Sequence, residues 1–244
     1  MNSPESQFDG ASPTAQQLPL ENAPPAQDLT ADLALAALKS LDLPSETVEQ
    51  ISKNTVVVKS RKVRFALAAH PRTPLRIALR LVRELYSFEL LRLSLLPSVQ
   101  PNLKRIADEL LVSRLPSATV GERISLARRG TGAVAAVLLL DRETRVWQAA
   151  LENPRLTESS VVKALLRQNA SPAFVLAICH LAKWTVRPEI QIALLRSEYT
   201  PLAIALKFGR RLSPPILREV LYSSHLPEKI KACLRREREL EKDR

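Results

Sequence analysis

Arginines beside predicted helix ends are the residues of this sequence best suited to bind a ligand. Arg72 and Arg155 each follow a proline that closes a predicted helix, and two arginine pairs stand beside glycines. A guanidinium stays charged and donates paired hydrogen bonds to a carboxylate or a phosphate. The sequence therefore predicts a basic edge made of six residues, Arg72, Arg128, Arg129, Arg155, Arg210 and Arg211.

The segment RRGTG, residues 128–132, places two bases and two glycines directly before a predicted helix. Free N–H groups and the helix dipole at such a position attract anions. The spacing G-x-x-x-x-G-K-[ST] is absent, however, and so is G-x-G-x-x-G after a strand. A plain turn between two helices is therefore the favoured interpretation of this segment.

Residues that could catalyse a reaction or hold a metal are few. Cys179 and His180 are adjacent, but neighbouring residues of a helix point about 100° apart. The chain has three histidines, His70, His180 and His225, and its second cysteine, Cys233, is distant, which disfavours a four-ligand zinc site. We expect no metal, no cofactor and no catalytic residues, and we expect both cysteines to be reduced and buried.

The elements that carry these residues are predicted to be helices. The 244 residues are 45% hydrophobic and only 4% aromatic, and alanine, leucine and arginine dominate. Such a mixture favours helices over strands and suffices for a sizeable core. We therefore expect an all-α chain.

Charge is distributed unevenly along the chain. All 36 bases but only 20 of the 25 acids fall in residues 39–244, so that part carries a formal charge of +16. The bias favours an anionic partner, such as an acidic protein surface or nucleic acid, although a basic surface also serves solubility.

The first 30 residues differ from the rest. They contain five prolines and no Lys or Arg, which indicates a disordered acidic tail over 1–30, followed by a helical domain over 31–244. The opening MNSPESQFDG lacks the basic and apolar regions of a signal peptide. The longest apolar run, AVAAVLLL at 133–140, is too short to span a bilayer, so we expect a cytoplasmic protein.

A helix–turn–helix corner recurs along the chain. In HPRTP, residues 70–74, Pro71 should end one helix at His70, and Thr73 with Pro74 should start the next. The same pattern returns around Pro97 and Pro154, and glycines replace it at 130–132. The breaks at 71, 97, 130 and 154 are about 24 to 33 residues apart, with a further break at 209, as in helical repeat arrays. Further helix starts are predicted at Thr119, where Glu122 completes a capping box, and at Ser171-Pro172, Thr200-Pro201 and Ser213-Pro214.

The predicted helix over 74–86 is apolar almost all round. Its polar residues form one narrow stripe, in which Arg76, Arg80 and Arg83 make a second candidate basic surface. A helix of this kind is typically buried between neighbouring helices, as in a solenoid.

Two stretches, VRFALAAHPRTPLRIALRLV at 63–82 and VWQAALENPRLTESSVVKAL at 146–165, resemble bacterial variant leucine-rich repeats. Units of that family share the core V-R-x-x-(V/A)-A-x-N-P-x-T-P, and the chain resembles HEAT-type repeats more broadly. The resemblance is close for two units and loose over residues 45–235, with irregular spacing and without the cysteine-rich iron–sulfur segment of some relatives. It implies a right-handed α-solenoid of stacked antiparallel helix pairs and no particular chemistry, and the second segments look long enough for full α-helices.

Trp147 and Trp184 are the two tryptophans, and Asp141, Glu143 and Glu152 lie near the first in sequence. Aromatic and carboxylate residues line the pocket of some DNA-repair glycosylases built from HEAT-like repeats, an analogy at the level of fold alone. Large aromatic residues that fill gaps between stacked helices are the simpler interpretation.

The function expected from these patterns is binding rather than catalysis. The first hypothesis is a non-enzymatic scaffold that binds a partner protein with an acidic segment through the basic edge or a concave face. The alternative is a protein that holds the backbone of duplex nucleic acid through the same arginines. A HEAT-like DNA glycosylase is the remote third hypothesis.

Overall fold

The structure is a computed structural model that describes residues 29–167 and 170–242, and its regular elements there are all helical. This confirms the all-α prediction for the described part of the chain. The first helix, α1 (Ala31–Ala37), begins where the pattern predicts and is capped by the Thr30 hydroxyl, which accepts from the backbone N–H of Leu33. The predicted tail lies, up to residue 28, outside the described residues.

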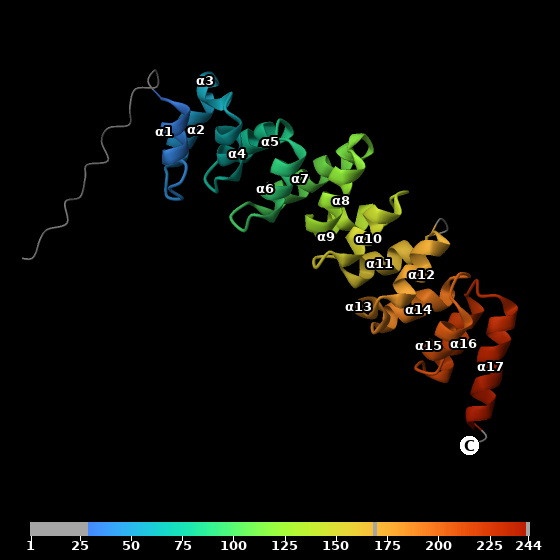
Figure 1. The fold of residues 1–244 in the computed structure, drawn as a ribbon. Helices are drawn as coiled ribbons and strands as arrows, with labels where there is room; N and C mark the ends of the chain where they lie inside the picture. Colours follow the sequence, from blue (N-terminus) through green and yellow to red (C-terminus); the bar gives the residue numbers. More distant parts are fainter. Residues whose placement is uncertain (1–28, 168–169, 243–244) are drawn as a thin grey trace, which may run out of the picture.

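The helices form two rows along an elongated array (Figure 1). The first row holds α1, α4 (Arg61–Ala69), α6 (Ser87–Leu95), α8 (Val120–Arg129), α10 (Thr144–Glu152), α12 (Pro172–His180), α15 (Leu202–Gly209) and α17 (Glu228–Lys242). The second row holds α2 (Ser45–Lys53), α5 (Leu75–Arg83), α7 (Pro101–Arg114), α9 (Gly132–Leu138), α11 (Glu158–Leu165), α14 (Pro188–Arg196) and α16 (Pro214–Tyr222). Three short helices, α3 (Thr55–Val58), η1 (Leu115–Ser117) and α13 (Ala182–Thr185), lie in the connections.

Contacts between helices define these rows. In the second row α5 contacts α7, α7 contacts α9, α9 contacts α11, α11 contacts α14 and α14 contacts α16. In the first row α4 contacts α6, α8 contacts α10 and α15 contacts α17. We call the turn from a first-row helix to its second-row partner a corner, and the turn back to the first row a return. Corners therefore share one edge of the array and returns the other; in Figure 1 the corners after α4 and α6 lie along the lower-left side of the array.

The corner after α4 ends one helix and starts the next, with a correction to the predicted details. His70 is extended, with ψ of 129°, because Pro71 disfavours helical geometry before it. Helix α5 begins at Leu75, and the Thr73 hydroxyl is not its cap. That hydroxyl donates instead to the carbonyl of Leu67, 2.6 Å away, at the end of α4.

The later helix starts were predicted with mixed success. Thr200 repeats the arrangement of Thr73, since its hydroxyl donates to Leu194 O at 2.6 Å and Pro201 takes the cap position of α15. The capping box of Thr119 with Glu122 is confirmed. Ser171 caps α12 as predicted, and Ser213 precedes α16, whose first residue is Pro214.

Helix α5 is shorter and less enclosed than predicted. It ends at Arg83 rather than Tyr86, because the Glu89 carboxylate accepts the backbone N–H of Tyr86 at 2.8 Å and thereby starts α6. Leu75 is 39% exposed, so the helix is not buried all round. The second-row helices α5, α7, α9 and α11 are full α-helices, as predicted.

The glycine corner between α8 and α9 allows two corners to approach closely. A Cβ atom at Gly132 would lie 2.4 Å from the backbone oxygen of Arg155 in the next corner. A Cβ atom at Gly130 would lie 2.4 Å from Leu126 O, at the end of α8. A side chain at Gly132 would force the two corners apart, and one at Gly130 would collide with the end of α8.

Buried side chains reach across from one corner to the preceding one. The ring of His70 accepts the backbone N–H of Arg72 at Nδ1 (3.2 Å), so that Nε2 carries the proton and donates to Ser40 O (3.0 Å). Asn153 occupies the matching position: its Oδ1 accepts the N–H of Arg155 (2.8 Å), and its Nδ2 donates to Ala127 O (2.7 Å) and Gly130 O (3.1 Å). We call these contacts the corner hydrogen bonds.

The corner hydrogen bonds of Asn153 are expected to stabilise the fold strongly. Replacement of this fully buried residue by alanine removes the donor from two buried carbonyls. We expect Asn153→Ala to lower the free energy of unfolding by about 3 kcal/mol. Urea unfolding followed by circular dichroism measures this loss. The exposed Gln148→Ala in the same helix is the matched control, and an equal loss in both variants would contradict the importance of the corner bonds.

The stability of the fold is expected to depend on pH through Asp108 on α7. Burial raises the pKa of its carboxyl group, although the Thr131 hydroxyl donates to Oδ2 at 2.8 Å. The folded state favours the protonated form of Asp108. The contribution of this residue to the free energy of unfolding is therefore fully present below the pKa of the unfolded state, and it is lost as pH rises through the raised pKa of the folded state.

The variant Asp108→Asn stays neutral and therefore lacks this loss. We expect its stability to exceed that of the wild type by a margin that grows as pH rises above about 4. Urea unfolding of both proteins over an acidic to neutral pH series measures the margin. A margin that stays constant or shrinks with rising pH would show that Asp108 is not held in an unfavourable charged state.

Candidate functional site

The structure places all six arginines of the predicted basic edge at corners. Arg72 follows α4, Arg128 and Arg129 end α8, Arg155 follows α10, and Arg210 with Arg211 follow α15. All six are exposed. Neighbouring helices of a row lie roughly 8–10 Å apart, so that successive corners bring these side chains to one edge of the array, here called the corner edge.

Acidic residues are interleaved with the bases on the corner edge. Arg72 lies 3.9 Å from Asp42, Arg128 lies 3.2 Å from Glu152, and Arg210 pairs with Glu237. Solvent screens such exposed pairs, which therefore add little to stability. Arg129, Arg155 and Arg211 form no ion pair within the described part of the chain and remain the strongest candidates for an outside ligand.

Two further bases belong to the corner edge, and the sequence analysis did not include them. Lys183 and Arg187 lie in the connection from α12 to α14, at the next corner after Arg155. The Lys183 ammonium donates to the carbonyls of Leu151 (3.2 Å) and Asn153 (3.0 Å), so it also extends the corner hydrogen bonds. Burial, and then the nearby charge of Arg187, lowers the pKa of Lys183.

The only sequence signal for this corner is KWTVR, with two bases around a tryptophan. Lys183 and Arg187 both lie over the Trp184 ring, at 4.6 Å and 5.4 Å from its centroid. Arg187 also pairs with Glu158 at 3.1 Å. No proline or glycine marks the break between α12 and α13, which is why the pattern of HPRTP could not find it.

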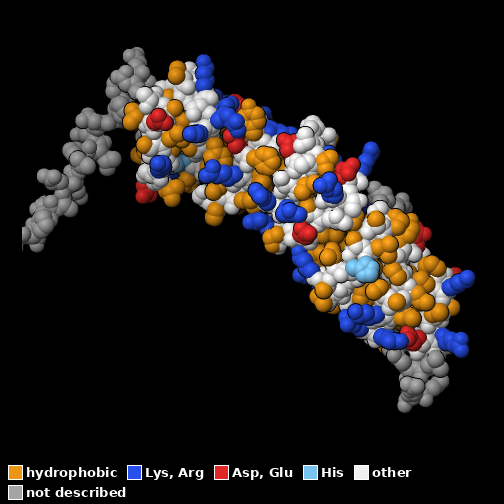
Figure 2. All heavy atoms as spheres, viewed as in Figure 1, with side chains coloured by type: hydrophobic (Ala, Val, Ile, Leu, Met, Phe, Trp, Pro, Cys, Tyr) orange, Lys and Arg blue, Asp and Glu red, His pale blue; other side chains and the backbone are white. Residues whose placement is uncertain are grey.

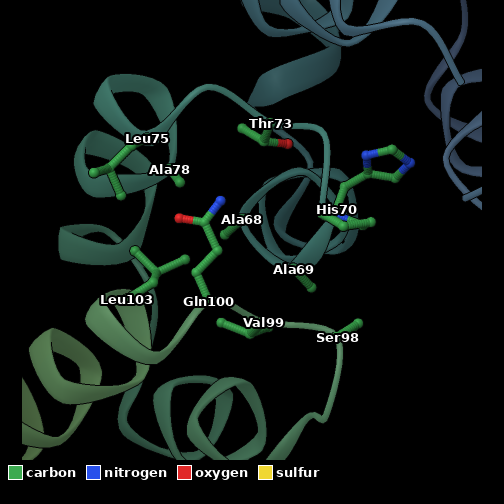
Figure 3. Close-up of a pocket in the computed structure, with 11 residues that line it drawn as sticks. Ala68, Ala69, His70, Thr73, Leu75, Ala78, Ser98, Val99, Gln100 and Leu103 are labelled. Carbon is green, nitrogen blue, oxygen red and sulfur yellow. The ribbon is translucent and has the colours of Figure 1, made fainter.

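The corner after α6 interrupts the series of bases. Its residues, 96–100, contain no Lys or Arg, and Leu96 stands where His70 and Asn153 make the corner hydrogen bonds. A hollow of about 10 Å³, room for about one water, separates this corner from the one after α4. Figure 3 shows the Gln100 side chain directed between the two corners. This neutral interval divides Arg72 from the group that starts at Arg128.

The second candidate surface, the stripe of Arg76, Arg80 and Arg83, lies on the exposed side of α5. Arg76 pairs with Glu49 of the neighbouring α2. Because these residues belong to a helix rather than to a corner, the stripe crosses the array instead of following its edge. Figure 2 shows Lys and Arg side chains along most of the length of the face in view, with Asp and Glu at fewer positions.

The aromatic residues considered for a pocket are parts of the core. Trp184 is fully buried and donates Nε1–H to Leu151 O at 3.3 Å. Trp147 is 4% exposed and packs edge-on against Phe174, with 5.5 Å between ring centroids. Asp141 is 2.8 Å from Arg123, in an ion pair that does not involve either tryptophan. The structure therefore gives no support to a pocket built from these groups.

The cysteines differ from each other. Cys179 is buried, and burial raises the pKa of its thiol to about 11, whereas the adjacent His180 points to solvent. Cys233 is exposed on α17, so the prediction of a buried thiol was wrong there. Residues 29–167 and 170–242 hold no group of three or more His, Cys, Asp and Glu side chains that could bind a metal ion.

The RRGTG segment is a turn between α8 and α9, which is the interpretation favoured in the sequence analysis. Thr131 caps α9 by accepting the N–H of Val134 at 3.4 Å, and it donates its own hydroxyl proton to Asp108. Helix α9 has only seven residues. The cap and the short helix leave this segment without a separate anion site.

Comparison with known proteins gives no family, because no family model, no curated protein and no solved structure matches this chain. In the described part of the chain, no helix has the length and apolar character needed to cross a membrane.

The arginines of the corner edge are expected to be dispensable for folding. In the double variant Arg72→Glu with Arg155→Glu, we expect a melting temperature within about 2 °C of the wild type, because exposed substitutions change stability little. Thermal unfolding followed by circular dichroism tests this. Loss of the helical signal at room temperature would instead make these arginines structural and remove them as candidate binding residues.

Proposed function

We propose that the chain is a right-handed α-solenoid built from HEAT-like units related to variant leucine-rich repeats. The order of helices supports this, since α4 with α5, α6 with α7, α8 with α9 and α10 with α11 each contribute one helix to each row. The matching roles of His70 and Asn153 also support repetition of one unit. Each unit contacts mainly its neighbours in the array, which is the property that defines solenoid proteins.

The proposed function is that of a non-enzymatic scaffold that binds an acidic segment of a partner protein at the corner edge. The observation that carries it is the line of exposed bases at the corners after α4, α8, α10 and α15, of which Arg129, Arg155 and Arg211 have no acidic partner among the described residues. An extended acidic chain that lies along the edge would place carboxylates beside each of them, with paired hydrogen bonds.

Duplex nucleic acid is the second candidate, and the interleaved acids argue against it. Phosphates follow each other every ~3.4 Å along one strand, whereas neighbouring corners are separated by roughly 8–10 Å. Asp42, Glu152, Glu158 and Glu237 lie within 4.0 Å of bases of this edge and would repel a continuous row of phosphates. An acidic protein segment can match such a spaced pattern. The glycosylase hypothesis loses its basis because both tryptophans are core residues.

A comparison of two charge-reversal variants tests the proposal. The edge variant combines Arg129→Glu, Arg155→Glu and Arg211→Glu, and the control combines Arg80→Glu, Arg145→Glu and Arg218→Glu, which are exposed residues outside the corners. Fluorescence anisotropy measures binding of a labelled peptide of alternating Glu and Ala. We expect the edge variant to bind at least roughly tenfold more weakly, and the control to retain most of the affinity.

Equal losses in the two variants would show that net charge alone attracts the peptide, and would contradict a defined edge. The same titration with a labelled random duplex separates the two candidates. Tighter binding of the duplex, with a log–log salt slope of several units at about 0.9 per phosphate contact, would favour the nucleic-acid function instead.

A further inference from the structure

Two successive helices of the first row, α12 and α15, are apolar on their outward side as well as on their buried side. Apart from His180 at its end, α12 has no charged or amide side chain, and the only charged side chain of α15 is that of Lys207. The apolar face, as named here, consists of outward residues that are all exposed or half-buried: Ala173, Leu176, Ala177, Leu202, Ala203 and Leu206.

Other helices of the first row present polar side chains at their exposed positions. The exposed residues of α4 are Arg61 and Lys62, and those of α10 are polar or charged throughout. On the apolar face, by contrast, Leu176 is 39% exposed and Leu202 is 43% exposed. Figure 2 shows hydrophobic side chains gathered on the part of the array between α12 and α17. An apolar surface of this kind marks a place where another molecule makes contact.

The segments that carry the apolar face contain bases but no acids. Residues 170–188 and 200–218 have no Asp or Glu. Lys183 follows α12 and Lys207 lies near the end of α15; both are exposed, and neither forms an ion pair within the described part of the chain. Acids of the neighbouring helices pair instead with arginines of this region. The charge around the apolar face therefore favours a negatively charged occupant.

The apolar face adjoins the corner edge, because α12 and α15 both end at a corner. Leu181, which is 37% exposed, continues the face from α12 towards Lys183. Arg211 follows α15 at the other corner. A segment bound along the corner edge therefore passes the ends of both helices.

Charge and exposure together decide between the occupants that an apolar face can have. A second copy of this chain would bring the same bases, and repulsion between like charges disfavours that contact. A bilayer requires apolar side chains that insert among the lipids, whereas Leu176 and Leu202 keep more than half of their surface inside the array. An acidic protein segment suits the site, since its carboxylates match the bases and its own apolar side chains cover the leucines.

We infer that the acidic segment bound at the corner edge also carries leucine-sized apolar side chains, which pack on the apolar face where the segment passes α12 and α15. Lys183, Lys207 and Arg211 hold its carboxylates, and Leu176 and Leu202 contact its apolar side chains. This inference rests on the proposed function and names the chemistry of its partner.

A matched pair of labelled peptides tests the inference with the full chain. The first is the peptide of alternating Glu and Ala, and the second has three of its central alanines replaced by leucine at unchanged charge. Fluorescence anisotropy measures both affinities. We expect the leucine peptide to bind at least roughly tenfold more tightly, because its contact with the apolar face removes apolar surface from water.

Two double variants locate this gain. The face variant, Leu176→Ser with Leu202→Ser, should bind the alanine peptide as the wild type does and should lose most of the gain from leucine. The control, Leu75→Ser with Val137→Ser, replaces similarly exposed residues of the second-row helices α5 and α9 and should keep the gain. Circular dichroism shows whether each variant is folded, and the peptide pair tests the wild type even where one is not.

Equal affinities of the wild type for the two peptides would overturn the inference, and the proposed function would stand if the edge variant still weakens the alanine peptide. A gain that persists in the face variant, or that falls equally in the control, would also overturn the inference. So would anionic phospholipid vesicles that bind more tightly than the leucine peptide and lose this binding in the face variant. A leucine gain combined with full affinity of the edge variant would contradict the proposed function alone.

Discussion

Stacking of the units depends on side chains that donate hydrogen bonds to buried carbonyls at or just after the ends of the first-row helices. A helix leaves its last carbonyls without partners, and burial of such groups is costly. At two corners the donor is a buried side chain, His70 or Asn153, and at a third it is the ammonium of Lys183. Each of these donors belongs to the following unit. The same hydrogen bond therefore satisfies a carbonyl of one unit and holds the next unit against it.

This constraint also determines where the arginines lie. His70 and Asn153 accept the backbone N–H of the residue two positions later, which is Arg72 or Arg155. The backbone of each arginine is thereby held in the turn, while its side chain remains exposed. The positions of Arg72 and Arg155 on the basic edge thus follow from how their two corners are closed. Where Leu96 replaces the polar residue, the corner hydrogen bond and the base are both missing.

Local signals explain how much of this could be predicted from the sequence. Pro71, Gly130 and Ser171 act on their own backbone or on the adjacent turn, and they marked helix ends correctly. Thr73 was misplaced because its hydroxyl has two acceptable roles, as a cap for α5 or as a donor to α4, and only packing decides between them. The outward position of Cys233 likewise depends on which side of α17 meets α15.

Contacts between units were beyond the reach of the sequence. Lys183 reaches Asn153 across 30 residues, and Trp184 reaches Leu151 across 33 residues. Neither has a local pattern, because the distance between units is fixed by side-chain volume in the core and not by any one motif.

The measurement that tests the central claim most directly is paramagnetic NMR with a nitroxide-labelled acidic peptide. The account predicts that amide signals broaden along one edge, at the corners of Arg72, Arg129, Arg155, Lys183 and Arg211. Broadening centred on the α5 stripe around Arg80, or spread evenly over the surface, would contradict the claim that stacked corners build one binding edge.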